Sequence, residues 1–272
     1  MNDTQNRLIC LIPHYNNPGA LVASLGSIGA AEACDVLVVD DGSTRAPIDV
    51  AACRSAFVAQ GTLRFLNLPQ NRGIEHALNA GLEWIRGRGY ELVARLDCGD
   101  LNVSDRFAMQ TAFLDAHPDI ALLGGAAEFV DQQGKVLYVM RHPSEHADIA
   151  RTMRANSAFI HPAVMYRVAA LAETGLYPLD TPAAEDYALF WQFVARFRTA
   201  NLPEVLIRYE LDPGGISLSK RSKQLKSRLL VQRRHSDGSP AALAGIARTY
   251  ALRLAPAGLI GRLKARLRKG RT

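Results

Sequence analysis

Residues 36–44 read VLVVDDGST, an apolar run of four residues followed by two aspartates, a glycine and two hydroxyl residues. A β-branched run this short predicts a buried strand, and Asp, Gly and Ser directly after it are typical of a turn. The other elements expected in the first hundred residues are strands at 8–12, 63–66 and 92–96 and helices at 18–30 and 73–86. This β-α-β-α-β order predicts an α/β fold with a mostly parallel central sheet covered by helices on both faces.

The pattern changes after residue 100, and no linker separates the two parts of the chain on either side of this point. We therefore expect residues 1–100 and 101–218 to be two halves of one domain, with a basic helical extension over 219–272. The elements expected in the second half are helices at 104–116 and 145–155, strands at 120–129 and 136–140, and a helix that opens at Glu185.

The composition of the chain is that of a globular protein. Of its 272 residues, 48% are hydrophobic and 21% are charged, which excludes the disordered and collagen-like classes. The four cysteines have no metal-ligand or paired spacing, so a zinc site or a disulfide framework is not expected. The first residues lack the pattern of a signal peptide, and no apolar run reaches the about 18 residues of a spanning helix. These features predict a cytoplasmic protein.

The charge of the chain is divided unevenly. Residues 219–272 hold fifteen Lys and Arg against the single acid Asp237, whereas the remainder holds 17 bases and 25 acids. A dedicated nucleic-acid binder normally carries its basic face on the folded domain, so no nucleic-acid partner is expected. Within 238–272, leucines alternate with eight basic residues, which favours contact with an anionic membrane surface over a solvated extension or an oligomer contact.

Acidic loops come directly after two of the expected strands. Asp40 and Asp41 end one strand, and Asp97 and Asp100 flank Cys98-Gly99 after another. Ligands of parallel α/β sheets bind beyond the carboxyl ends of the strands, and carboxylates together with substrate phosphates suit Mg²⁺ or Mn²⁺. Each acidic pair is also compatible with an ordinary turn.

Three further segments are candidates for a site. Asn71-Arg72-Gly73 opens a helix, where free N–H groups favour an anion such as a diphosphate. Glu185-Asp186 opens another helix, either as charges that stabilise the helix dipole or as a general base. His161 is a candidate for the pocket.

In order along the chain, these segments resemble family 2 glycosyltransferases, which are inverting enzymes with the GT-A fold. The segments that carry the resemblance are IPHYNN (12–17), VVDDGST (38–44), NRGIEHALNAGL (71–82), ARLDCGD (94–100), HPAVMYR (161–167), AEDYALF (184–190) and PGGIS (213–217). The resemblance implies an enzyme that moves a sugar from a nucleoside-diphosphate sugar to a hydroxyl of a glycan or glycolipid acceptor, in the synthesis of cell-surface polysaccharide.

The resemblance also implies roles for individual residues. Asp40 matches the position that contacts the nucleobase, with Asp41 beside it, and Pro13 and Tyr15 would line the same pocket. The full set implied for the nucleotide-sugar is Pro13, Tyr15, Asp40, Asp41, Asn71, Arg72, Gly73, Asp97 and His161.

For metal and catalysis, LDCGD resembles the D-x-D motif that holds Mn²⁺ or Mg²⁺. Asp97 and Asp100 match its first and fourth positions, whereas Gly99 stands at the third, where the family usually has Asp. Asp186 resembles the catalytic base that deprotonates the acceptor hydroxyl, with Glu185 ranked second.

Two other functions remain open from the sequence. A sugar-phosphate nucleotidyltransferase would share the nucleotide-binding architecture but would carry a Gly-rich phosphate loop with a basic residue near the first strand. The segment IPHYNNPG at this place is not such a loop. A relative that binds nucleotide-sugar without turnover is the other alternative, favoured only by Gly99. A lipid-linked acceptor at the inner face of the cell membrane would explain the basic extension.

Overall fold

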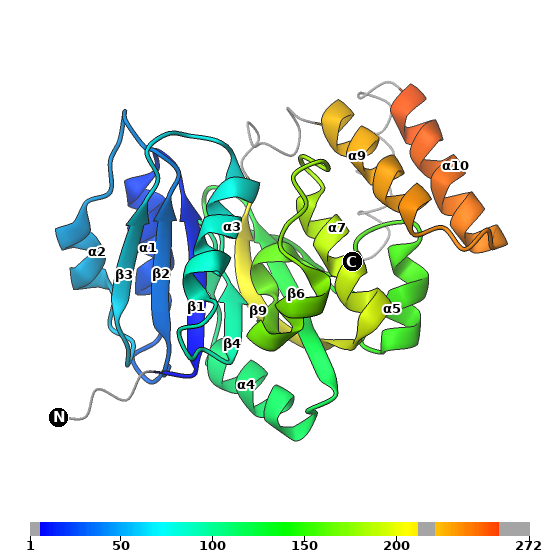
Figure 1. Cartoon of the computed structure of the whole chain (residues 1–272). Coiled ribbons are helices and arrows are strands. Elements are labelled where there is room, and N and C mark those ends of the chain that lie inside the picture. Colours follow the sequence, from blue (N-terminus) through cyan, green and yellow to red (C-terminus); the bar gives the residue numbers. More distant parts are fainter. Residues whose placement is uncertain (1–5, 212–220, 256–272) are drawn as a thin grey trace.

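A single nine-stranded sheet forms the centre of the protein, in a computed structural model that describes residues 6–211 and 221–255 (Figure 1). The strand order is β3-β2-β1-β4-β8-β6-β9-β5, and β7 pairs with β6 at the side. The strands are β1 Leu8–His14, β2 Asp35–Asp40, β3 Leu63–Asn67, β4 Leu92–Arg95, β5 Leu101–Asn102, β6 Ile120–Val130, β7 Val136–Met140, β8 Met165–Arg167 and β9 Arg198–Glu210.

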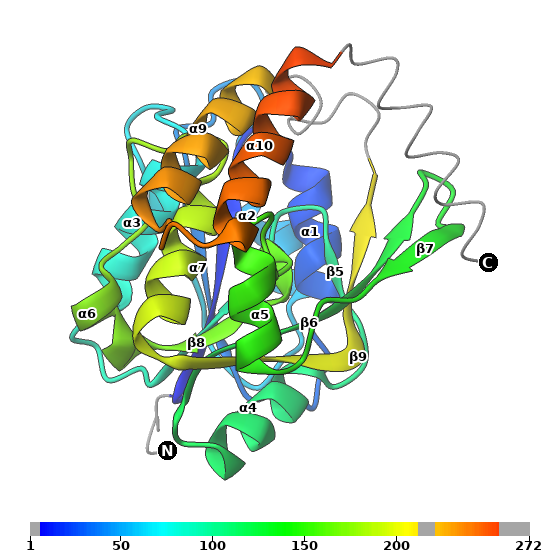
Figure 2. The ribbon, with the colours of Figure 1, turned by 90° about the vertical axis from the view of Figure 1, so that its right-hand side faces the viewer.

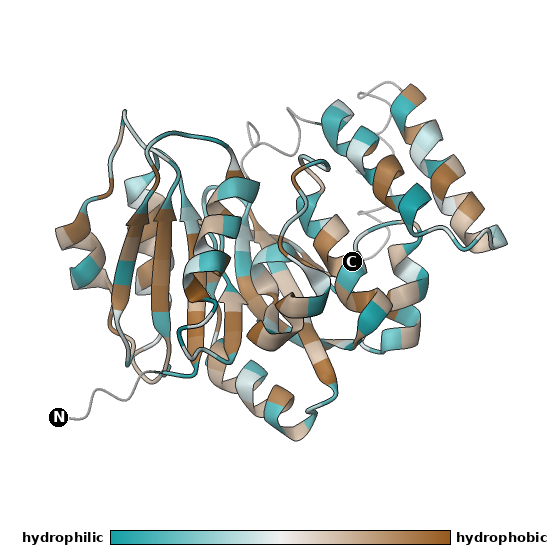
Figure 3. Cartoon of the chain, viewed as in Figure 1, coloured by the Kyte–Doolittle hydropathy of each residue, from teal (hydrophilic) through white to brown (hydrophobic). Residues whose placement is uncertain are grey.

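Helices cover both faces of the sheet, and the residues of β1, β2 and β4 alternate between two hydrophobic cores. Ile9 and Leu11 of β1 pack with α3 and α7, whereas Leu8, Cys10 and Ile12 pack with α1, α2 and α4. Strands that are buried on both faces are mostly apolar, and the strands of the sheet are largely brown in Figure 3. These helices are α1 Pro18–Gly26, α2 Val50–Ala56, α3 Ile74–Ile85, α4 Arg106–Ala116, α5 His146–Met153, α6 Leu171–Thr174 and α7 Glu185–Arg196.

The register of the first strands decides where the acidic loops lie. Strand β1 runs parallel to β2 and β4, with His14 opposite Asp40 and Leu11 opposite Arg95. Because the carboxyl ends of parallel strands meet at one edge, the loops that carry Asp41 and Asp97 leave the sheet on the same side. The predicted convergence of the acidic loops is a consequence of this register.

The second half of the sheet is mixed rather than parallel, and the sheet continues without a break past residue 101. Strand β6 runs parallel to β9 but antiparallel to β7 and β8, and β5 is antiparallel to β9. The expected strands and helices are present in the described residues with shifts at their ends; α1 stops at Gly26 rather than at 30. The elements that sequence patterns did not indicate are α2, β5, α6, β8 and β9.

The basic extension forms two packed helices as far as residue 255. Helix α9, Arg221–Arg234, lies against α7, and α10, Pro240–Leu254, lies against α9 (Figure 2). Gly245 of α10 lies so close to the end of α5 that a Cβ atom there would stand 2.2 Å from the carbonyl oxygen of Arg154. The two helices are therefore packed onto the second half of the domain, and the rest of the predicted extension, 256–272, falls outside the described residues.

Candidate active site

A cavity of about 690 Å³ lies at the carboxyl ends of β1, β2 and β4. Its walls come from the end of β1 and the loop after it, the start of α3, the loop after β4, the segment before α7 and the start of α9. The predicted site residues that line it are Pro13, Tyr15, Asp41, Asn71, Arg72, Gly73, Asp97 and Glu185. Those that do not are Asp40, Asp100, His161 and Asp186. The cavity thus gathers side chains from distant parts of the chain at the edge where α/β sheets bind ligands.

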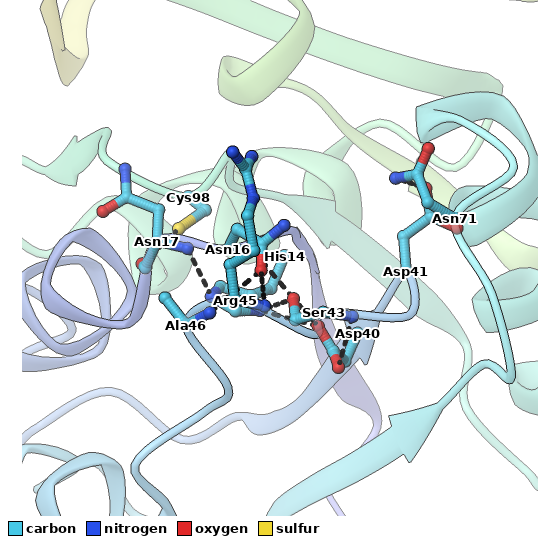
Figure 4. A network of polar contacts seen from close by, with 10 residues as sticks. All are labelled: His14, Asn16, Asn17, Asp40, Asp41, Ser43, Arg45, Ala46, Asn71 and Cys98. Atoms are coloured by element: carbon cyan, nitrogen blue, oxygen red, sulfur yellow. Dashed lines mark hydrogen bonds and ion pairs between the residues drawn. The ribbon is translucent and has the colours of Figure 1, made fainter.

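Asp40 is bound within the loop rather than exposed to this cavity (Figure 4). Its Oδ1 lies 2.9 Å from Nδ1 of His14 and accepts the hydroxyl of Ser43 at 2.5 Å. Nε2 of His14 accepts the backbone N–H of Asn17 at 3.1 Å, which places the ring proton on Nδ1, facing Asp40. Asp40 lines a second, smaller cavity of about 340 Å³ beside β3. In this arrangement Asp40 orders the loops around the larger cavity.

Asp41 reaches the cavity and also holds the start of α3. Its carboxylate accepts the Asn71 side-chain amide at 2.8 Å and the backbone N–H groups of Arg72 and Gly73 at 3.0 and 2.9 Å. A carboxylate at a helix start is favoured by the free N–H groups and the dipole. The two amides that the sequence offered to a diphosphate are therefore already bonded to Asp41.

Asp97 is the member of the LDCGD segment that faces the cavity, and Arg95 and His161 lie against its carboxylate. Nη2 of Arg95 lies 2.5 Å from its Oδ1, and Nδ1 of His161 lies 3.6 Å from its Oδ2. Arg95 is wholly buried, and its Nε donates to Nε2 of His161, which also meets the hydroxyl of Tyr177 at 2.9 Å. Burial lowers the pKa of His161. His161 thus lies next to Asp97 but is not among the residues that line the cavity.

Asp100 lies apart from the cavity. It is buried, its Oδ2 has no hydrogen-bond partner among the described residues, and burial and the charge of Asp97 raise the pKa of its carboxyl well above the usual range. Gly99 between them has φ of +106°, a conformation that side chains rarely adopt, so this loop is shaped for glycine at the third position. In the described residues, no three His, Cys, Asp or Glu side chains converge as ligands of an ion.

Glu185 and Asp186 occupy the first turn of α7, and of the two Glu185 lies in the cavity wall. Glu185 lines the cavity with 7% of its surface exposed, and its Oε2 has no partner among the described residues. Burial, and next the charge of Asp186, raise the pKa of Glu185 to about 8. Asp186 is half-buried, and its Oδ1 accepts the N–H of Tyr187 at 2.7 Å. At neutral pH, Glu185 therefore holds its proton.

The cavity also contains residues that sequence reasoning did not single out. Glu75 lies in the first turn of α3, and Lys223 comes from the start of α9. Ala183, just before α7, has φ of +63°, a strained value for a residue with a side chain. In the sequence, Glu75 looks like a charge at a helix start, and Lys223 is one of many bases in the extension. What distinguishes Lys223 from the other bases of the extension is its place in the cavity wall, which results from the packing of α9 against the domain.

Comparison with known sequences identifies a family and several relatives. The model described as Glycosyl transferase family 2 matches residues 9–175. An uncharacterized glycosyltransferase of Haemophilus influenzae is 30% identical over 239 residues, which is 85% of this chain and 86% of that protein. The amylovoran biosynthesis glycosyltransferase AmsE of Erwinia amylovora is 28% identical over 73% of each chain. The UDP-Gal:alpha-D-GlcNAc-diphosphoundecaprenol beta-1,3-galactosyltransferase of Escherichia coli is 27% identical over 64% of this chain and 61% of that protein.

Solved structures share the GT-A fold. Residues 1–349 of S. aureus TarS in complex with UDP-GlcNAc superpose with a TM-score of 0.66 at 18% identity, covering 89% of this chain and 71% of that one. The mannosyltransferase PcManGT of Pyrobaculum calidifontis, in complex with GDP-Man and Mn²⁺, gives 0.61 at 19% identity, over 97% of this chain and 80% of that one. At these identities the likeness establishes the fold.

Proposed function

This chain belongs to glycosyl transferase family 2, and from that membership we propose that it moves a sugar from a nucleoside-diphosphate sugar to a hydroxyl of a glycan or lipid-linked acceptor. The observation that carries the proposal is the cavity that Asp41, Asp97 and Glu185 all line, with Asp186 next along the chain. The nucleotide would occupy the end formed by Pro13 and Tyr15. The sugar would then extend towards the start of α7.

In this proposal, Asp186 takes the proton from the acceptor hydroxyl as that oxygen attacks the anomeric carbon. The new bond forms on the face opposite the diphosphate, the bond from the anomeric carbon to the diphosphate oxygen breaks, and the configuration inverts. Glu185 is less suited to this role, because a carboxyl with a pKa of about 8 still holds its own proton at neutral pH. Within this mechanism, Asp186 is the base and Glu185 a neutral hydrogen-bonding group at the cavity wall.

A divalent cation fits the cavity through Asp97 rather than through the predicted pair. Mg²⁺ and Mn²⁺ prefer oxygen, and they need only one or two carboxylates when phosphates and water complete the shell. Asp97 offers a carboxylate at the cavity, whereas Asp100 does not line it. When bound, such a cation would neutralise charge on the departing diphosphate. The structure of the mannosyltransferase PcManGT was solved with GDP-Man and Mn²⁺, and its similar fold supports a divalent cation in this cavity by analogy.

The acceptor is proposed from relatives and from the surface of α10. One relative is by name a transferase to a diphosphoundecaprenol-linked sugar, and another belongs to amylovoran biosynthesis. Leu243 and Leu254 of α10 are 56% and 85% exposed, and Arg248 and Arg253 lie on the same helix. Apolar side chains flanked by bases suit the surface of an anionic bilayer. None of the described helices has the length and apolar character to cross a bilayer.

The membrane contact is tested with vesicles. The protein should sediment with vesicles that contain phosphatidylglycerol and remain free with pure phosphatidylcholine, and Leu243→Ser/Leu254→Ser should weaken the binding. If this variant and the parent bind the anionic vesicles equally, these leucines of α10 do not contact the membrane. Retention on DNA with no binding to anionic vesicles would instead favour a nucleic-acid role for the basic extension.

The transfer proposal is tested first by ligand stabilisation. UDP, GDP, dTDP and CMP are each added with and without Mg²⁺ or Mn²⁺, because a ligand of the folded state raises the unfolding temperature by mass action. A rise with one nucleoside diphosphate that increases with the metal supports a transferase and names the donor nucleotide. The absence of a rise with any of the four would contradict the assignment of the cavity.

A further inference from the structure

The cavity contains few positive charges to meet a diphosphate. Its carboxyl groups are Asp41, Glu75, Asp97 and Glu185, whereas Arg72 and Lys223 are the only Lys or Arg side chains among its described lining residues. A nucleoside diphosphate brings two or more negative charges into this surrounding, so its affinity depends strongly on the cations that face it.

The start of α3 cannot supply all of this attraction. The backbone N–H groups of Arg72 and Gly73 already donate to the carboxylate of Asp41. That carboxylate also cancels part of the positive end of the helix dipole. The Arg72 side chain remains at this wall, and besides a metal ion at Asp97 the other positive side chain that the described cavity offers is Lys223.

Helix α9 is held in a position that presents Lys223 to the cavity. Ser227 is buried, and its hydroxyl donates to the carbonyl oxygen of Pro182 at 2.8 Å. Residues four apart share one face of a helix, so the face that carries Lys223 is the face attached to the cavity-lining segment. At the other end of α9, Arg234 pairs with Asp180 at 3.1 Å.

We propose that Lys223 binds the diphosphate of the donor, across the cavity from Arg72. The proposal rests on the transferase function and assigns to it a residue beyond 9–175, the range that the family model matches. It makes the start of the basic extension part of the donor site. The remainder of that extension keeps the role proposed above, which is contact with an anionic membrane surface.

The test compares two lysines on one helix with two kinds of ligand. Lys223→Gln removes the charge in the cavity, and Lys226→Gln removes an equal charge three residues later, at an exposed position that does not line the cavity. Calorimetry measures the Kd of UDP, GDP and dTDP, and of the matching nucleosides, for the full chain and both variants. Each is measured with and without Mg²⁺.

Lys223→Gln should weaken the nucleoside diphosphate that binds by about tenfold, from loss of a charge-assisted contact, and leave the affinity for its nucleoside unchanged. Lys226→Gln should change neither Kd by as much as twofold. The difference between the variants should shrink as salt is added, because exposed charges are screened.

Three results would overturn the assignment of Lys223. Equal diphosphate affinity of the parent and Lys223→Gln removes the contact. If both glutamine variants bind the nucleoside diphosphate equally weakly, the effect comes from the overall charge of the protein and not from a contact of Lys223. If Lys223→Gln also binds the nucleoside more weakly, the substitution has distorted the cavity. If the parent protein binds no nucleoside diphosphate, the transferase proposal fails before the role of Lys223 is reached.

Discussion

Arg95 and Asp97 form an ion pair of 2.5 Å across the end of β4, in which the guanidinium is wholly buried and the carboxylate faces the cavity. The buried cation also donates to the carbonyl oxygen of Leu11 on the neighbouring strand. It therefore joins the central sheet to the one predicted metal ligand that reaches the cavity.

Replacement of this cation should destabilise the fold as well as the site. Arg95→Met removes one partner of a buried pair and should lower the free energy of unfolding by about 3 kcal/mol. Urea denaturation measures the loss, with Arg253→Met on exposed α10 as the control. The double variant Arg95→Met/Asp97→Asn should recover part of the stability, and no recovery would mean that the pair is not coupled.

Asp186 is expected to matter for turnover and not for donor binding. Asp186→Asn should lower kcat by at least about 100-fold, the usual contribution of a general base, and leave the Kd of the nucleoside diphosphate within twofold. Asp119→Asn, in an exposed ion pair with Arg198, is the control and should retain activity. A parallel loss of binding and turnover in Asp186→Asn would make that residue structural.

Glu185 should make stability depend on pH. Its folded pKa of about 8 lies above its ordinary value of 4.5, so its contribution is complete below about pH 4.5 and is lost as pH rises through 8. Glu185→Gln has no carboxyl that can ionise, so it cannot undergo this loss. The Tm of the variant minus the Tm of the parent should therefore be larger at pH 8.5 than at pH 5. The increase should be about 2–4 °C for each kcal/mol of stability that the parent loses. Thermal unfolding across this range measures the difference, and a gap that does not change with pH would contradict the buried protonated state.

Glu75 is expected to oppose the donor diphosphate. Glu75→Gln removes a carboxylate from the cavity wall near Arg72 and should tighten binding of the nucleoside diphosphate about threefold at low salt. Glu83→Gln, on the exposed side of the same helix, is the matched control. Weaker binding of Glu75→Gln would instead indicate that the glutamate contacts the ligand directly.

Local sequence pattern predicted the elements with strong periodicity or buried apolar runs. Strands β1 to β4 and helix α3 have one apolar pattern each, and the structure places them where expected. Strand β9 was missed because Pro203 lies within it and because register shifts in its pairing with β6 break the alternation of its side chains. Strand β8 has only three residues and no periodicity to detect.

The site was predictable only as far as its contacts are local in sequence. Asp41, Asp97 and Glu185 come after strand ends or open a helix, and such positions can be recognised from the residues alone. Three other features depend on which distant segments pack together. They are the hydrogen bonds of Asp41 to the start of α3, the burial of Asp100 outside the cavity and the place of Lys223 in the cavity wall. No pattern within one segment contains that information.

The walls of the cavity are made at different times during synthesis of the chain. The first four strands lie within residues 8–95, whereas Glu185 and Lys223 come from the last third of the sequence. Domains generally fold as units, so a nascent chain that ends before residue 185 carries the strands of the sheet edge but lacks the opposite wall of the cavity. If Lys223 binds the donor diphosphate as proposed, a chain that ends before α9 should bind the donor about tenfold more weakly than the full chain.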